Sequence, residues 1–277
     1  MLPFLVAVLL ETRFATLDAG LATAAQASPR PRECRGAASG EDGVWLRLRG
    51  ADAQRYCDLL ARGYARLSET PKEALSAAQA ADALAGNTTA VRVLTGRAQL
   101  RLGQSALAYE QFASAEAAQP QAFSDPKTLH DYARAASLAG KSESALRLYR
   151  LLVSRAALLS DARERAFCQI ETAAHVLAHA ANGSDEALGY LAQMRQQSLG
   201  LSPWINGLRL LASRRGAHAE QRRVASVAAS TASLGAPPPA GFSDEFPLLP
   251  PGMFEALRTA LTESSDPTAS AAKGKAR

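Results

Sequence analysis

The sequence predicts an all-α protein built from repeated pairs of helices. Hydrophobic residues make up 47% of its 277 residues, only 6% of the chain is aromatic, and alanine, the strongest helix former, is frequent throughout. Runs of β-branched residues, which indicate strands, are almost absent. Four similar segments also place alanines 34, 37 and 42 residues apart, at Ala74, Ala108, Ala145 and Ala187. A spacing of about 34 residues is typical of solenoids of paired helices.

Residues 1–27 are expected to form a signal peptide or an apolar leader. Residues 2–10 (LPFLVAVLL) have the length of the hydrophobic part of a signal peptide, and residues 25–27 (AQA) resemble a cleavage site. Against this, no Lys or Arg precedes the run, and Glu11 and Arg13 follow it closely. We favour export to the periplasm or cell envelope over a cytoplasmic location. The run is too short to span a bilayer, so we expect no transmembrane segment.

The three cysteines do not have the spacing of a zinc site or a redox motif. If the protein is exported, Cys34 and Cys57 can form a disulfide, whereas in a reducing cytosol both would remain thiols. Because the number is odd, at least one thiol is free or pairs with another chain. Cys168 is the one left over if the first two pair.

Residues 28–51 are rich in Pro, Gly, Arg and Ser and are expected to form a linker. Helical periodicity then runs from residue 52 to about residue 230. Thr70-Pro71 and Asp125-Pro126 indicate helix starts, because proline is favoured at the first helical position. Gly103 and Gly140 lie where helices should end, since a helix commonly closes on a left-handed glycine.

The second repeat resembles the tetratricopeptide repeat (TPR). In that family a small residue, a turn glycine, an alanine, an aromatic residue, a second alanine and a closing proline stand at fixed positions. This chain fills them with Gly96, Gly103, Ala108, Phe112, Ala115 and Pro120. Small residues allow two helices to approach closely, and the aromatic ring fills the gap to the next repeat.

The resemblance extends to the neighbouring repeats and implies a fold. The third repeat keeps Gly140, Ala145 and Tyr149, the first keeps Ala74, and the more divergent fourth keeps Ala187. The resemblance therefore implies a right-handed α-solenoid of antiparallel helix pairs, with about four repeats over residues 52–230. It also implies a non-enzymatic interaction module, for example in a bacterial cell-envelope assembly.

The C-terminal part leaves the repeat pattern. Residues 231–252 form a Pro/Gly-rich connector, and residues 253–263 predict an amphipathic helix with Phe254, Leu257 and Leu261 on one face. We expect this helix to cap the last repeat. The alternative is a docking peptide for a partner. Residues 264–277 have the composition of a disordered tail.

One helix carries a polar stripe that can be read in two ways. Cys168, Glu171, His175 and His179 are spaced three, four and four residues apart and share one helical face. All four are competent zinc ligands, which gives the alternative hypothesis of a metal-binding or hydrolytic protein. The pattern is not HExxH, and one helix rarely supplies a whole metal site. We expect this stripe to be a solvated helix face.

No other pattern indicates catalysis. Nucleotide-binding glycine loops and nucleophile elbows are absent from the sequence, and Asp244-Glu245 are expected to lie in a loop without partners. We therefore predict a protein without enzymatic activity, cofactor or metal. The net charge of +5 and pI of about 9.3 are mildly basic, but no basic cluster alternates with aromatic residues, so we do not expect nucleic acid as a partner.

The TPR resemblance implies a concave groove lined by the first helix of each repeat. Carried over by position, the groove residues are Arg97, Arg101, Lys127, His130, Arg134, His175 and His179. Their basic character implies a protein or peptide partner with acidic groups. The alternative is that these are ordinary exposed helix residues.

Overall fold

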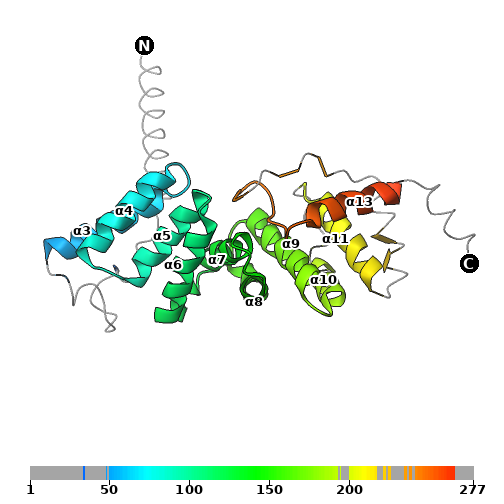
Figure 1. The fold of residues 1–277 in the computed structure, drawn as a ribbon, viewed down its shortest axis with the longest axis horizontal. Helices are drawn as coiled ribbons and strands as arrows, with labels where there is room; N and C mark the ends of the chain where they lie inside the picture. Colours follow the sequence, from blue (N-terminus) through cyan, green and yellow to red (C-terminus); the bar gives the residue numbers. More distant parts are fainter. Residues whose placement is uncertain are drawn as a thin grey trace, which may run out of the picture. The chain divides into compact units, whose positions relative to one another are not determined.

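The computed structural model describes most of the chain between residues 50 and 265. Its described residues are Cys34, Leu48, 50–192, Met194, 200–216, 221–222, 224–225, 234–235, 237–238 and 241–265. Over these residues it contains ten α-helices, two short 3-10 helices and no strand, which confirms the all-α prediction (Figure 1). The predicted leader (1–27), most of the linker and residues 266–277 of the predicted tail (264–277) lie outside the described residues, whereas residues 264–265 belong to the last helix.

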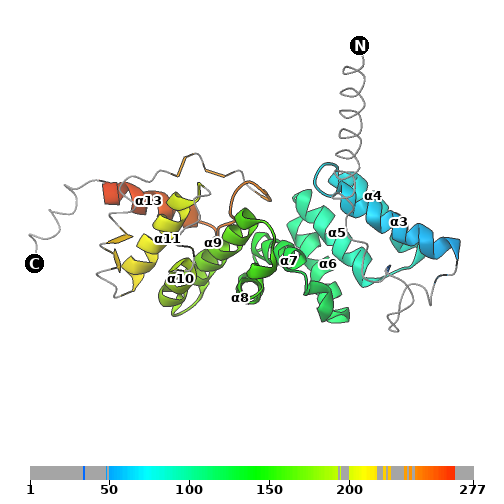
Figure 2. The same cartoon turned by 180° about the vertical axis from the view of Figure 1, so that it is seen from behind.

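The chain divides into two compact units, residues 1–95 and 96–277, with the boundary inside α5. Figures 1 and 2 show the helices of each unit from opposite sides. The helices are α3 (Ala51–Arg66), α4 (Pro71–Leu84), α5 (Thr89–Arg101), α6 (Ser105–Ala118), η2 (Pro120–Phe123), α7 (Pro126–Leu138), α8 (Ser142–Val153), η3 (Ala156–Leu158), α9 (Ala162–His179), α10 (Gly183–Ala192), α11 (Ser202–Arg215) and α13 (Met253–Ser265).

The first unit is built on α3 and α4, which pack against each other. Small residues bring its elements close together: a Cβ on Gly63 would lie only 2.5 Å from the side chain of Leu94. The buried hydroxyl of Tyr56 lies 2.7 Å from that of Thr88 and links α3 to the start of α5. Cys34 and Cys57 form a disulfide, which attaches residues before α3 to that helix.

In the second unit, each helix from α6 to α11 packs against the next one in sequence. The predicted contact residues of the second repeat lie inside: Ala108, Phe112 and Ala115 are fully buried in α6, whereas Ala118 is exposed. A Cβ on Gly96 would lie 3.0 Å from the ring of Phe112. Glycine is therefore needed where α5 and α6 meet.

The predicted helix ends are found at the expected positions. α4 and α7 begin at Pro71 and Pro126, and the Asp125 carboxylate caps α7 by accepting from the backbone N–H of Thr128 at 2.9 Å. Gly103 and Gly140 have positive φ angles of 75° and 71°. The residue after each glycine donates its backbone N–H to a carbonyl five positions before itself, Gln104 to Gln99 and Lys141 to Ala136. This is the Schellman type of helix end.

From α5 to α10, side chains also link each helix to the next but one. Through these bonds α5, α7 and α9 are neighbours, and so are α6, α8 and α10. The bonds are Arg97–Asp131 (2.6 Å), Arg134–Glu171 (2.6 Å), Tyr109–Ser144 (3.0 Å), Arg147–Glu116 (2.9 Å) and Arg150–Glu186 (2.7 Å). Their partners are 31 to 37 residues apart, which is about one repeat.

The C-terminal helix α13 packs on α11 and buries the apolar face predicted for residues 253–263. Leu257 and Leu261 are buried where Gly207 of α11 leaves space, and Phe254 lies 5.7 Å from Trp204 between ring centroids. The helix that we expected to act as a cap therefore buries its apolar face against α11 of the same chain. No helix among the described residues has the length and apolar character needed to cross a membrane.

Candidate functional site

Four of the seven predicted groove residues contact two buried carboxylates. The first is Asp131 of α7, which accepts from Arg97 Nε at 2.6 Å and lies 3.4 Å from Arg101 Nη1. Burial alone would raise the pKa of Asp131, but these two guanidinium groups outweigh burial and hold that pKa well below its ordinary value. Asp131 is therefore ionised, and it fixes both arginines of α5 in place.

The second carboxylate is Glu171 of α9, which is fully buried. It accepts from Arg134 Nη2 at 2.6 Å and lies 2.7 Å from His130 Nε2. The hydroxyl of Tyr149 and the backbone N–H of Leu248 also donate to it, at 3.0 and 2.9 Å. Burial raises the pKa of Glu171, but Arg134 and His130 lower it far more, so this carboxylate also stays charged.

The two buried histidines have opposite charge states. Burial lowers the pKa of His130, but the neighbouring Cys168 and Glu171 outweigh burial and raise it to about 10. His175 lies only 1% exposed, and burial lowers its pKa to about 4. The neutral ring of His175 bridges the Glu171 carbonyl (Nδ1, 2.8 Å) and the Ser137 hydroxyl (Nε2, 2.8 Å). His130 is thus cationic and His175 neutral near pH 7.

The remaining predicted groove residues lie at the surface. Lys127 is exposed and lies 3.8 Å from Glu164, and His179 is exposed at the end of α9. Of the seven predicted residues, Arg97, His130, Arg134 and His175 are buried and Arg101 is half-buried. The structure therefore brings five of them together, and four of these, Arg97, Arg101, His130 and Arg134, are cations that share the two carboxylates of Asp131 and Glu171.

The expectation of a solvated polar stripe on α9 is wrong. Cys168, Glu171 and His175 are at most 1% exposed, and of the four stripe residues only His179 reaches solvent. α9 packs on α8 and α10, and its side chains also bond to α7, so both its polar and its apolar faces are buried. Its polar side chains bond to other helices instead of water.

The same geometry bears on the metal hypothesis. Over the described part of the chain, no three His, Cys, Asp or Glu side chains are grouped so that they could hold a metal ion. Glu171 is instead directed at Arg134, and His175 at Ser137. A carboxylate already bound to a guanidinium is poorly suited to a cation.

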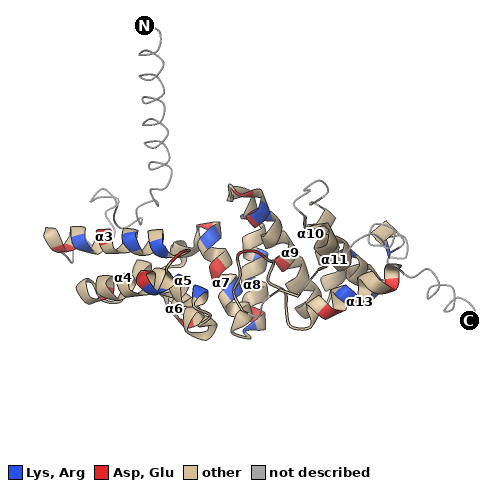
Figure 3. Ribbon diagram, turned by 90° about the horizontal axis from the view of Figure 1, so that it is seen from above, with Lys and Arg blue, Asp and Glu red and all other residues tan. Residues whose placement is uncertain are grey.

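A segment distant in sequence lies on this cluster, and we call it the strap (residues 241–250). The ring centroid of Phe242 lies 5.0 Å from Arg101 Cζ and 5.5 Å from Arg134 Cζ. Arg134 Nη1 donates to the Ser243 carbonyl at 3.3 Å, and Arg163 Nη2 donates to the Glu245 carbonyl at 2.8 Å. Through these side chains the strap contacts α5, α7 and α9 before it leads into α13; Figure 1 shows it as the orange segment near α9, and Figure 3 shows the charged residues of these helices.

The strap overturns one expectation from the sequence. Asp244-Glu245 was expected to lie without partners, but the Asp244 carboxylate is 3.5 Å from Arg134 Nη1 and the Glu245 carbonyl accepts from Arg163. The sequence signal that could have indicated this contact is the pair of phenylalanines around the acidic residues, since apolar residues in a connector need a surface to cover them.

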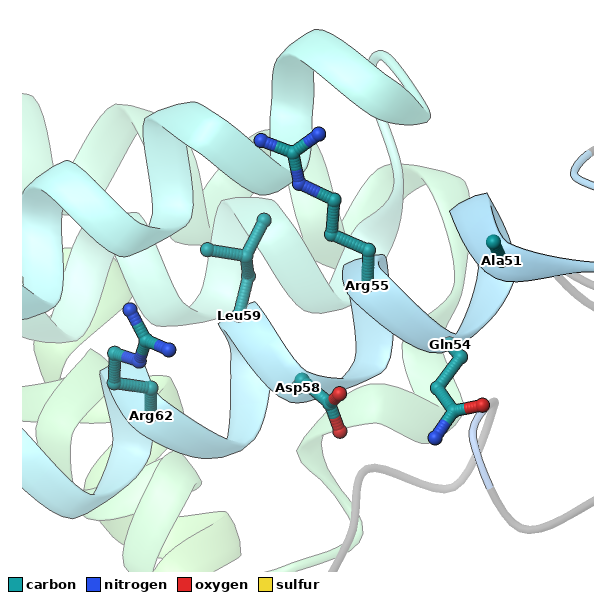
Figure 4. Close-up of a pocket in the computed structure, with 6 residues that line it drawn as sticks. All are labelled: Ala51, Gln54, Arg55, Asp58, Leu59 and Arg62. Carbon is teal, nitrogen blue, oxygen red and sulfur yellow. The ribbon is translucent and has the colours of Figure 1, made fainter.

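A shallow pocket lies elsewhere, along α3. Its lining residues are Ala51, Gln54, Arg55, Asp58, Leu59 and Arg62, all from this one helix (Figure 4). Arg55, Leu59 and Arg62 project to one side of α3, and Gln54 and Asp58 to the other. This mixture of both charges along a single helix defines no specific ligand, so the α5/α7/α9 face is the stronger candidate.

Comparison with known proteins identifies no relative: no family model, curated protein or solved structure matches this chain.

Proposed function

We propose that this protein is a non-enzymatic interaction module that binds an extended segment of a partner protein across α5, α7 and α9. The observation that carries the proposal is the strap: this face already holds a non-helical stretch of polypeptide through arginine side chains. Arg134 and Arg163 donate to its backbone carbonyls, and two guanidinium groups lie over its aromatic ring. Contacts of this kind bind main chain and acidic side chains together.

We further propose that the helices form a TPR-like solenoid of antiparallel pairs. Bonds between next-but-one helices at about one repeat spacing support this arrangement, because in a stack of pairs each first helix lies beside the next first helix. The same helix end at Gly103 and Gly140 also supports it. In such a stack α5, α7 and α9 would be the first helices, which line the concave side.

The disulfide supports a location outside the reducing cytosol. Cys34 and Cys57 are bonded, and such bridges persist mainly in oxidising compartments. The proposed module therefore operates in the cell envelope or beyond it, in agreement with the leader at residues 1–27. Its partner would be a protein of that compartment.

Site-specific photo-crosslinking tests the proposed face. A photoreactive residue in place of Lys127, which is exposed on α7, should attach covalently to the partner in the native host. The same residue in place of Lys141, exposed at the turn before α8, is the matched control and should not. The yield of the cross-linked product should fall as the salt concentration rises, because exposed charges are screened over about 10 Å at roughly 0.1 M. Cross-linking only at Lys141, or equally at both positions, would place the partner elsewhere.

A further inference from the structure

The two halves of the strap are held differently. The inner half, residues 246–250, is fixed: Pro247 and Pro250 are buried, and the Leu248 N–H donates to the fully buried Glu171. Phe246 and Leu249 also pack against the hydrophobic cluster of α9, α10, α11 and α13. Release of this half would uncover apolar surface and remove a hydrogen bond from a buried charge.

The outer half, residues 241–245, is held at the surface. Gly241, Asp244 and Glu245 are exposed, and Phe242 is only half-buried. Its contacts are an aromatic ring over two arginines, two backbone carbonyls and one carboxylate that is 65% exposed. The Asp244 carboxylate lies largely in water and faces an arginine that Glu171 already neutralises, and a half-buried ring adds only a weak cation–π contact, so this half can leave while the inner half stays.

The helix surface beneath the outer half of the strap is held in shape by contacts within the helices themselves. Arg101 is held by Asp131, and Arg134 by Glu171, both within the helices. Over the described residues, the buried Nε of Arg101 makes no hydrogen bond although Phe242 lies beside it. The outer half of the strap therefore leaves that donor unused.

We propose that the outer half of the strap is an internal competitor for the partner, and that the partner segment carries an aromatic residue followed two positions later by a carboxylate. This is the pattern of Phe242 and Asp244, and it fits arginines that are already in position. The inference rests on the proposed function, because it names the partner chemistry and the regulation of the same face. A competitor bound for about 90–99% of the time would weaken partner binding about ten- to hundredfold.

A labelled synthetic peptide with the sequence of residues 241–246 is the probe. Its binding to the full chain is followed by fluorescence anisotropy. The double variant Phe242→Ala/Asp244→Ala frees the face and should bind the peptide at least tenfold more tightly than the unaltered chain. Glu245→Ala is the matched control, since Glu245 contacts Arg163 and Ser243 through its backbone, and it should bind like the unaltered chain. Addition of Arg163→Ala to the double variant should weaken binding several-fold.

Each other result decides against part of the inference. Equal affinity for the unaltered chain and the double variant would show that the outer half does not compete. No binding to any chain would overturn the partner chemistry. Hydrogen exchange gives an independent readout: the amides of residues 242–245 should exchange at least a hundredfold faster than those of α9, and equal protection would show that the strap is fixed. In each of these cases, cross-linking of a partner at position 127 would still support the proposed function. The two experiments therefore distinguish a failure of the competitor hypothesis from a failure of the proposed function.

Discussion

Arg134 and Glu171 form an ion pair with a separation of 2.6 Å, and their side chains are only 4% and 0% exposed. They are 37 residues apart and join α7 to α9. Because each neutralises the other away from water, neither can be removed without leaving a buried charge alone. Arg134 therefore has a structural role whatever binds above it.

Arg134→Ala should destabilise the second unit by about 3–5 kcal/mol, since Glu171 would keep its burial but lose its main counter-charge. Urea unfolding measures this loss. Arg147→Ala is the matched control, because Arg147 forms a bidentate ion pair with Glu116 at the surface. That change should cost less than about 1 kcal/mol. Similar losses for the two variants would contradict the burial of the Arg134–Glu171 pair.

Stability should be greatest near pH 6.5 and fall on both sides. The pKa of His130 is raised to about 10, so its contribution is complete below about pH 6.5 and is lost as pH rises towards 10. The pKa of His175 is lowered to about 4, so its contribution is complete above about pH 6.5 and is lost as pH falls towards 4.

Two variants separate these effects in urea titrations across pH. His130→Gln should remove most of the alkaline fall, and His175→Gln should remove most of the fall between about pH 6.5 and 4.5. Below that range Glu171 dominates, because its lowered pKa gives stability that disappears on further acidification. A His175→Gln protein with an unchanged slope between pH 6.5 and 4.5 would contradict the assignment.

Ala108→Leu should lower the melting temperature clearly. Ala108 is fully buried in α6, where added volume forces its neighbours apart at a cost of about 1–3 kcal/mol. Ala118→Leu, at the exposed end of the same helix, is the control and should change little. Thermal unfolding followed by circular dichroism compares the two, and equal tolerance would argue against the TPR register.

The disulfide predicts a simple thiol count. In denatured protein without reductant, only Cys168 should react with an alkylating agent, whereas all three cysteines should react after reduction. Cys57→Ala should destabilise the first unit by about 3 kcal/mol, because the bridge closes a loop with a sequence separation of 23. Three reactive thiols in unreduced protein from the native host would place it in a reducing compartment. Export would give a mature chain that starts near Ser28.

The sequence allowed the local features to be predicted. Proline at position 71 or 126, glycine at 103 or 140 and alanine at 108 each act through a few neighbouring residues, and the structure places them as expected. Helix starts, helix ends and close contacts depend on backbone geometry that a short segment determines by itself.

The site could not be predicted in the same way. The stripe of Glu171 and His175 has the pattern of a solvated face, and only the side chains of α7 show why it is buried. The strap is harder still, because its contacts with Glu171 and Arg134 join residues 77 and 110 positions apart, and it has no helical period. A local sequence pattern therefore cannot predict that the strap contacts α7 and α9.

These long separations have a consequence for the order of events during translation. The bonds between next-but-one helices join residues 31 to 37 apart, so α5 to α9 can assemble soon after they emerge, before the C-terminal segment follows. Residue 248 follows the end of α9 by a stretch that takes several seconds to synthesise at about 5–20 residues per second. During that interval the nascent chain displays a finished arginine face without its own covering segment. A partner that meets the chain as it emerges from the export machinery finds no internal rival, whereas one that arrives later does.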